Sequence, residues 1–169
     1  MPGDFRHIAV ASTKDQGETF SKRTIVSDDK WKIHACPVSG AAMSNGEKNI
    51  LNVVWYTQGE AGQAGLYLAS SRDGGKTFDP RRIVDPSRTI SGTPVAFDDS
   101  DGSTMCLFGL NGDWIKTAGV DTVLSSAIVM GDLITDASSP AATRINGNIY
   151  TAFVRTAGDK HTVWLAAIR

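Results

Sequence analysis

Short apolar segments alternate along this chain with polar segments rich in Asp, Gly, Ser and Thr. Apolar segments such as Ile50–Thr57, Leu66–Ser70 and Ile149–Val154 have the length of β-strands, and no long apolar pattern with a helical period of 3.6 residues occurs. Strand-length segments separated by Asp- and Gly-rich turns are typical of β-hairpins. The pattern therefore predicts an all-β fold.

One polar turn occurs twice. Residues 13–20 and 71–78 both read [Ser/Thr]-x-Asp-x-Gly-x-Thr-Phe, and the apolar segments on either side align without a gap at a separation of 58 positions. An Asp side chain can accept hydrogen bonds from backbone N–H groups of its own turn, Gly can adopt a positive φ, and we expect the Phe to anchor the turn in the core. The sequence thus predicts a structural role for the motif positions, which are Asp15, Gly17, Thr19, Phe20, Asp73, Gly75, Thr77 and Phe78.

This repeated turn resembles the Asp-box, or BNR repeat, of sialidase-like β-propellers. Two complete motifs with aligned flanking strands carry the resemblance. It implies four-stranded sheets, or blades, arranged around a central channel. Asp-boxes recur in sialidases, sortilin-type receptors and plant-cell-wall glycosidases, so the resemblance indicates a fold and leaves the activity open.

Three prolines, each before a short segment of small residues, mark the expected innermost strands at Pro37, Pro94 and Pro140. Their spacings of 57 and 46 residues are close to the length of one blade. In the 92–136 blade we expect a tight hairpin at 130–133 in place of the motif. As a single propeller domain over 1–169, the chain is expected to contain a partial blade 5–27, a blade 36–86, a blade 92–136 and a partial blade 139–169.

About three blades are too few to close a propeller, which needs roughly four to eight. Two chains would supply the six blades typical of sialidase-like propellers, so the sequence favours a two-fold homodimer that closes the ring. The alternatives are a fragment of a longer protein and a compact three-bladed monomer.

The two motif turns occupy one face of the expected disc, so a ligand is expected at the opposite face, near the mouth of the channel. Two tryptophans beside lysines fall in that rim, and the apolar face of a sugar ring packs well on an indole. The alternative is that these tryptophans cap blade interfaces. The candidate ligand-binding residues are Trp31, Lys32, His34, Arg88, Trp114, Lys116 and Arg155.

The sequence gives less evidence for catalytic residues than for ligand-binding residues. A sialidase-like hydrolase would, by the resemblance, use three arginines, a Tyr/Glu nucleophile pair and an acid/base Asp, and the family's N-terminal Phe/Tyr-Arg-Ile-Pro element is absent here. Tyr56 with Glu60 is a candidate nucleophile pair. Two carboxylates roughly 5–9 Å apart would also be needed. The available carboxylates are Asp28, Asp29, Glu60 and Asp113.

The leading interpretation is therefore a non-catalytic sialidase-like module that binds a glycan or another small ligand at the channel mouth. One alternative is a glycoside hydrolase whose site is assembled across a dimer, and another is a structural or protein-interaction propeller.

Composition further restricts the functions that we expect of this protein. The net charge of −1 gives no basic footprint for nucleic acid, and no apolar run approaches the roughly 20 residues of a membrane-spanning helix. No signal-peptide core follows Met1, which predicts a cytoplasmic protein or one whose leader was removed.

Cys36 and Cys106 are isolated in apolar surroundings and are expected to be buried free thiols. No metal or cofactor is expected, since no Cys or His pair has metal-ligand spacing.

Overall fold

The computed structural model describes residues 5–33, 39–45, 49–59, 64–86, 90–98, 104–110, 114–120, 127–135, 137–146 and 148–168. Strands dominate these residues and none of them lies in an α-helix, which confirms the all-β prediction for this part of the chain. The strands form four sheets, in each of which consecutive strands pair antiparallel.

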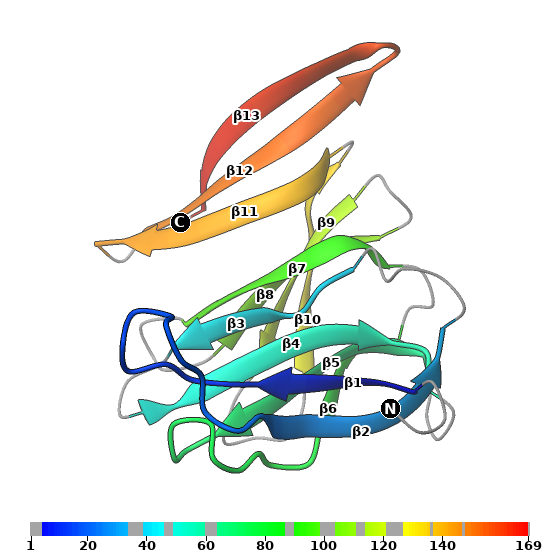
Figure 1. Ribbon diagram of the computed structural model, residues 1–169. Helices are drawn as coiled ribbons and strands as arrows, with labels where there is room; N and C mark the ends of the chain where they lie inside the picture. The colour runs from blue at the N-terminus through cyan, green and yellow to red at the C-terminus, as the bar shows by residue number, and fades with distance from the viewer. Residues whose placement is uncertain are drawn as a thin grey trace.

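The sheets follow one another in chain order (Figure 1). The first is a two-stranded sheet of β1 (Phe5–Val10) and β2 (Thr24–Lys32). The second contains β3 (Ala42–Asn45), β4 (Leu51–Thr57), β5 (Gly65–Ser71) and β6 (Arg82–Asp85). The third contains β7 (Ile90–Asp98), β8 (Thr104–Leu110), β9 (Trp114–Val120) and β10 (Ala127–Thr135). The fourth contains β11 (Ala137–Ile145), β12 (Asn148–Ala157) and β13 (Lys160–Ile168).

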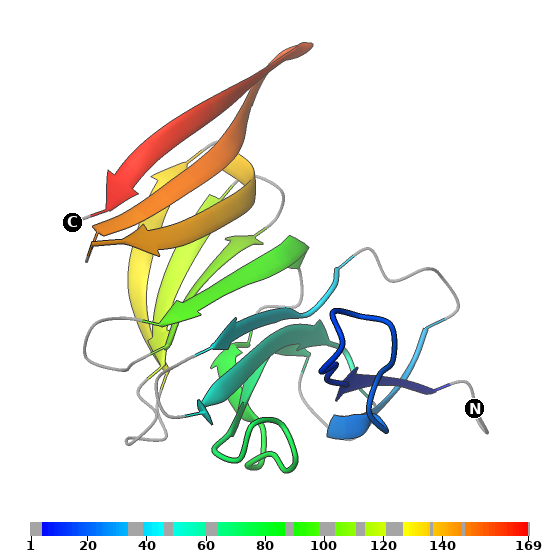
Figure 2. The ribbon, with the colours of Figure 1, turned by 60° about the vertical axis from the view of Figure 1, so that its left-hand side comes forward.

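The first strands of the last three sheets lie side by side, because β7 contacts both β3 and β11. Figure 2 shows the resulting row of sheets from a second direction, with β1 and β2 at one end and the β12–β13 hairpin at the other. Each sheet therefore packs against its neighbours in the row, as the blades of a propeller do.

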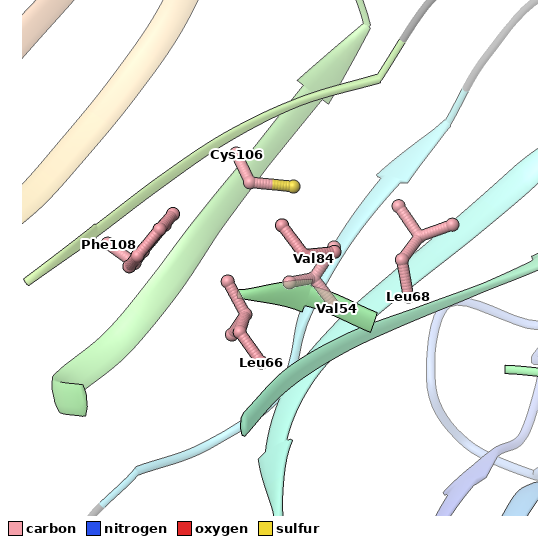
Figure 3. Packing of buried hydrophobic residues seen from close by; sticks show 6 residues of the cluster. All are labelled: Val54, Leu66, Leu68, Val84, Cys106 and Phe108. Carbon is pink, nitrogen blue, oxygen red and sulfur yellow. The ribbon is translucent and has the colours of Figure 1, made fainter. Parts of the chain in front are cut away.

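Three apolar clusters fill the spaces between neighbouring sheets. The cluster between the second and third sheets is drawn in Figure 3 and consists of Val54, Leu66, Leu68, Val84, Cys106 and Phe108. The cluster between the first and second sheets consists of Val26, Val53, Trp55, Tyr67 and Ala69, with Ile8, Val10 and Phe78 packed against it. The cluster between the third and fourth sheets consists of Phe97, Ala137, Ile149 and Phe153.

Strand periodicity explains why β4 and β5 are apolar on both faces. Val53 and Trp55 of β4 point toward the first sheet, whereas Val54 between them points toward the third. A sheet covered on both sides needs apolar residues at consecutive positions, and this is the pattern that the sequence shows at 50–57.

The predicted hairpin at 130–133 is wrong. These residues lie inside β10, which pairs with β9 from Ala127 opposite Val120 to Thr135 opposite Trp114. Gly131 marks a register shift between Val129 and Gly131. A glycine within a strand often marks such a bulge, and the sequence pattern alone did not distinguish the bulge from a turn.

Two of the predicted ligand residues, Trp31 and Arg155, lie within strands. β2 continues to Lys32, beyond the predicted boundary at 27, and β12 and β13 include all of the 155–161 segment except the turn at Gly158 and Asp159. The rim residues in these segments are therefore held by strand pairing.

The two repeated turns are closed by the same hydrogen bonds. In the first turn, Thr13 Oγ1 donates to Asp15 Oδ1 at 2.6 Å, the Thr19 amide donates to Asp15 Oδ1 at 2.9 Å, and Thr19 Oγ1 donates to Asp15 Oδ2. In the second, Ser71 Oγ (2.8 Å) and the Thr77 amide (2.9 Å) donate to Asp73 Oδ1. Both carboxylates therefore accept hydrogen bonds within their own turn.

The two aromatic residues that end these turns differ. Phe78 is half-buried and packs against the cluster between the first and second sheets. Phe20 at the equivalent position is 65% exposed, so the prediction that it anchors its turn in the core is wrong. The physical reason is that no sheet among the described residues lies over this face of the first sheet.

We expect the order of both turns to depend on pH. The hydrogen bonds from Thr13 and Thr19 lower the pKa of Asp15 from 3.8 to about 2, and those from Thr77 and Ser71 likewise lower the pKa of Asp73. Because the folded pKa lies below the unfolded one, the stabilisation is complete above the ordinary Asp pKa and is lost as the pH falls through the folded value. Hydrogen exchange followed by NMR should show the Thr19 amide losing protection as the pH falls from about 4 through about 2, and the Thr77 amide losing it only at a lower pH. A Thr19 amide that stays fully protected below pH 2 would contradict this linkage.

Candidate ligand-binding site

The end of the sheets opposite the repeated turns is the expected ligand face. β2, β4 and β12 all run toward this end, whereas the motif turns that follow β1 and β5 lie at the other (Figure 1). The ends of β2 and β4 therefore bring two separate parts of the chain to one place.

A pocket of about 250 Å³ lies there, lined by Lys30, Trp31, Lys32 and Gln58. Lys30, Trp31 and Lys32 are the last three residues of β2, and Gln58 directly follows the end of β4. The pocket is thus formed where the first and second sheets meet, and two of its four lining residues carry a positive charge at neutral pH.

The Trp31 side chain is held in place by Tyr56. Their rings meet edge to face, with centroids 6.0 Å apart and an interplanar angle of 89°. Tyr56 is buried, and its hydroxyl oxygen accepts a hydrogen bond of 2.8 Å from Gln58 Nε2. Lys32 extends over the Phe5 ring, 5.1 Å from its centroid. The indole is therefore positioned by packing before any ligand arrives.

An irregular segment of β2 presents these residues. Trp31 pairs with Arg6 and Ser27 pairs with Ile8, so residues 28–30 lie opposite His7 alone. Lys30 has a φ of 51°, in the left-handed region that is uncommon for a residue with a side chain. A bulge of this kind redirects side chains and is over-represented beside functional sites.

The bulge also turns Asp29 inward, where it joins the first two sheets. Asp29 is only 2% exposed, and its carboxylate accepts hydrogen bonds from Trp55 Nε1 and Ser27 Oγ, both at 2.6 Å. It also forms an ion pair with Arg81, whose guanidinium lies 4.4 Å from the centroid of the Tyr67 ring. Asp29 is thus occupied by structural contacts and is not available as a general acid or base.

The neighbouring carboxylate, Asp28, faces the other side of the bulge. Its Oδ1 lies 3.1 Å from His7 Nδ1, and its side chain is exposed. Of the four carboxylates that the sequence offered for hydrolysis, the structure describes only Asp28 and Asp29; Glu60 and Asp113 lie outside the described residues.

Close backbone contact at Gly59 fixes the loop of Gln58 against the bulge. A Cβ on Gly59 would lie 2.2 Å from the carbonyl oxygen of Asp29. We expect Gly59→Ala to push the two segments apart and to destabilise the protein by about 1–2 kcal/mol. Urea unfolding monitored by tryptophan fluorescence measures this cost.

Gly40→Ala is the matched control, because its Cβ would meet Thr93 Oγ1 only at 3.4 Å. Equal stability of the two alanine variants would show that the Gly59 contact imposes no constraint.

The remaining predicted ligand residues are distributed differently. Arg155 lies in β12 of the fourth sheet, with its guanidinium 5.1 Å from the Trp164 ring and 5.8 Å from the Phe153 ring. Its Nε is buried with no hydrogen-bond partner among the described residues. Trp114 and Lys116 lie at the start of β9, where the backbone alone is described. His34 and Arg88 lie outside the described residues.

The structure therefore brings together Trp31, Lys32 and Tyr56 of the predicted site residues, and it places Arg155 in a different sheet. Lys30 and Gln58 were not predicted as ligand residues. The sequence could have indicated them only by their position, because each lies within two positions of a predicted site residue.

The His, Cys, Asp and Glu side chains of the described residues are dispersed. These residues contain no group of three or more His, Cys, Asp or Glu side chains that could hold a metal ion. Cys106 is buried and free, as predicted, and burial together with the charge of Asp98 raises its pKa to about 12. Cys36 lies outside the described residues.

Among the described residues, no helix has the length and apolar character needed to cross a membrane.

No protein-family model matches the sequence, and no curated protein matches it. Several solved structures share the fold. The Hadza microbial sialidase Hz136 matches with a TM-score of 0.61 and 14% identity over 95% of this chain and 38% of its own. A protein of unknown function from Dyadobacter fermentans matches with a TM-score of 0.63 and 17% identity over 96% of this chain and 45% of its own. The NanB sialidase from Streptococcus pneumoniae matches with a TM-score of 0.61 and 18% identity over 87% of this chain and 24% of its own.

This chain thus spans less than half the length of these three structures. Identities this low carry the fold and not the activity. The chain has a sialidase-like, all-β propeller fold.

Proposed function

We propose that this chain is a propeller module whose repeated turns are Asp-boxes and which binds a saccharide in the pocket of Trp31. The observation that supports the proposal is the pocket of about 250 Å³ in which a fixed indole lies beside two lysines and an amide. The pocket lies where the first and second sheets meet.

Each lining residue can make a contact that suits a sugar. The apolar face of a pyranose ring packs on the indole of Trp31, and the Gln58 amide can donate to or accept from ring hydroxyls. The ammonium groups of Lys30 and Lys32 favour a saccharide that carries a carboxylate or a sulfate. A preorganised aromatic surface costs little conformational entropy when the ligand binds.

Substitution of Trp31 tests the proposal. We expect Trp31→Ala to weaken binding of the saccharide identified on a glycan array by about tenfold or more, which corresponds to about 1.4 kcal/mol of lost stacking. Isothermal titration calorimetry measures the affinity. Trp164→Ala is the matched control, because Trp164 is a partly exposed tryptophan of the fourth sheet.

Unchanged affinity in Trp31→Ala, or an equal loss in Trp164→Ala, would contradict a site at Trp31. Binding that weakens with added salt in the original protein, and less so in Lys30→Ala/Lys32→Ala, would support an anionic ligand.

A glycoside hydrolase is the second candidate, favoured by the sialidases among the similar structures. In that case Tyr56 with Glu60 would form the nucleophile pair and Asp113 would serve as an acid/base, completed by a second chain. Fluorogenic sialosides and aryl glycosides distinguish the candidates: turnover that is abolished in Tyr56→Phe favours the hydrolase. A protein-interaction propeller would bind no saccharide and turn over none of these substrates.

A further inference from the structure

Each end of the row of sheets has an exposed apolar face. The repeated motif allows the face of the first sheet to be compared with the equivalent, covered face of the second sheet. Ala9, Ala11 and Phe20 of the first sheet and its turn are exposed. The residues 58 positions later, Tyr67, Ala69 and Phe78, are the equivalents in the second sheet, where two are buried and Phe78 is half-buried. The difference arises because the first sheet covers the second, while no described sheet covers the first.

The surface that covers Phe78 is specific. The cluster around Phe78 includes Val26 of β2, and Ile8 and Val10 of β1 pack against it. β1 occupies the position in its sheet that β5 occupies in the second, directly before the repeated turn. A motif phenylalanine thus shares one apolar cluster with alternate aliphatic residues of the corresponding strand in the preceding sheet.

The far end of the row offers such a strand. In β13, Val163 is 75% exposed and Leu165 is 81% exposed. They pair across the sheet with Val154 and Ala152 of β12, so these side chains share one face with the 42% exposed Tyr150. The opposite face of the same sheet carries Ile149 and Phe153, which are buried against the third sheet.

The two exposed faces therefore match the two halves of an interface that already exists inside the chain. They lie at opposite ends of the row in both views, so one chain does not bring them together (Figures 1 and 2). We propose that a second copy of this chain covers them: Phe20 of each copy packs against Val163 and Leu165 of the other, and two copies close a single ring. Such a ring has two-fold symmetry and two identical contacts.

The lengths of the similar solved structures leave room for two copies of this chain. Matches that cover nearly all of this chain cover 38% and 45% of the Hadza sialidase and the Dyadobacter protein, so each of those single chains is about as long as two copies of this one or somewhat longer. Exposed apolar faces of this kind are typical of association surfaces. The proposal is independent of the saccharide pocket, which lies between two sheets of one chain.

Mass measurement in solution tests the proposal. Light scattering and native mass spectrometry of the 169-residue chain should give a dimer of twice its 18.0 kDa. Leu165→Glu should give a folded monomer, because it places a charge in the contact, whereas Lys76→Glu at the exposed second turn should remain dimeric. A monomer in the unmodified chain, or open oligomers larger than a dimer, would overturn the closed ring.

A charge-pair experiment tests which faces meet. Phe20→Lys and Leu165→Glu should each be monomeric alone, with the strand-rich circular dichroism spectrum of the original. Mixed together, they should form a heterodimer that has one Lys–Glu contact and one original contact. Two folded variants that remain monomeric after mixing would show that these faces do not pair, and variants that dimerise alone would show the same.

Discussion

Replacing Arg81 by Ala is expected to destabilise the protein by about 3–5 kcal/mol, one of the two largest effects that we predict for a single substitution. Asp29 is 2% exposed and forms its ion pair with Arg81 across the interface of the first two sheets. Removal of the guanidinium would leave a buried carboxylate without its countercharge, and a buried unpaired charge is among the most costly defects in a protein.

A second ion pair provides the control. Arg72 Nε lies 3.8 Å from Asp79 Oδ2, and both side chains are largely exposed. Exposed pairs of this kind contribute about 0–1 kcal/mol, so Arg72→Ala should unfold close to the unmodified protein. Chemical denaturation of both variants gives the comparison. If Arg81→Ala and Arg72→Ala were equally stable, the Asp29–Arg81 pair would not join the two sheets.

The second large effect is expected at Phe78. Phe78→Ala should lower the free energy of unfolding by about 2–3 kcal/mol, somewhat less than the roughly 3–5 kcal/mol of a fully buried phenylalanine, because Phe78 is only half-buried. Removal of this ring would leave a gap in the apolar cluster between the first and second sheets.

Phe20→Ala is the matched variant, since the same ring in the same turn motif is 65% exposed. Measured in the Leu165→Glu background, where the second copy is expected to be absent, Phe20→Ala should change stability by no more than about 0.5 kcal/mol. Urea unfolding of the two variants in that background separates the contributions. If Phe20→Ala lowered the free energy of unfolding as much as Phe78→Ala in this background, the Phe20 ring would have to be buried within a single chain.

The sequence predicted those features that depend on short-range pattern. The two turns could be recognised because their Asp, Gly and Thr positions are set by hydrogen bonds within eight residues, from Thr13 to Phe20 in the first. β4 and β5 could be recognised because strands covered on both faces are apolar at consecutive positions. These are local rules, and the local sequence satisfied them.

The sequence missed features that depend on distant partners. Phe20 and Phe78 have the same local sequence pattern, and they differ only in whether a sheet lies in front of them. Asp29 was a candidate catalytic carboxylate until the structure placed Arg81, 52 positions away, against it. No local pattern contains such a partner.

Bulges were the other source of error. A strand bulge shifts the alternation of side chains by a residue or more, so the inward position of Asp29 and the left-handed φ of Lys30 do not follow from a period of two. Gly131 misled the prediction of the third sheet for the same reason.

The most direct test of a saccharide site at the junction of the first two sheets is an NMR titration that observes the tryptophan indole N–H and glutamine amide signals. With the saccharide selected on a glycan array, the signals of Trp31 and Gln58 should shift in proportion to occupancy, while that of Trp164 in the fourth sheet stays in place. Shifts confined to Trp164, or no change at Trp31 at saturating saccharide, would contradict the account.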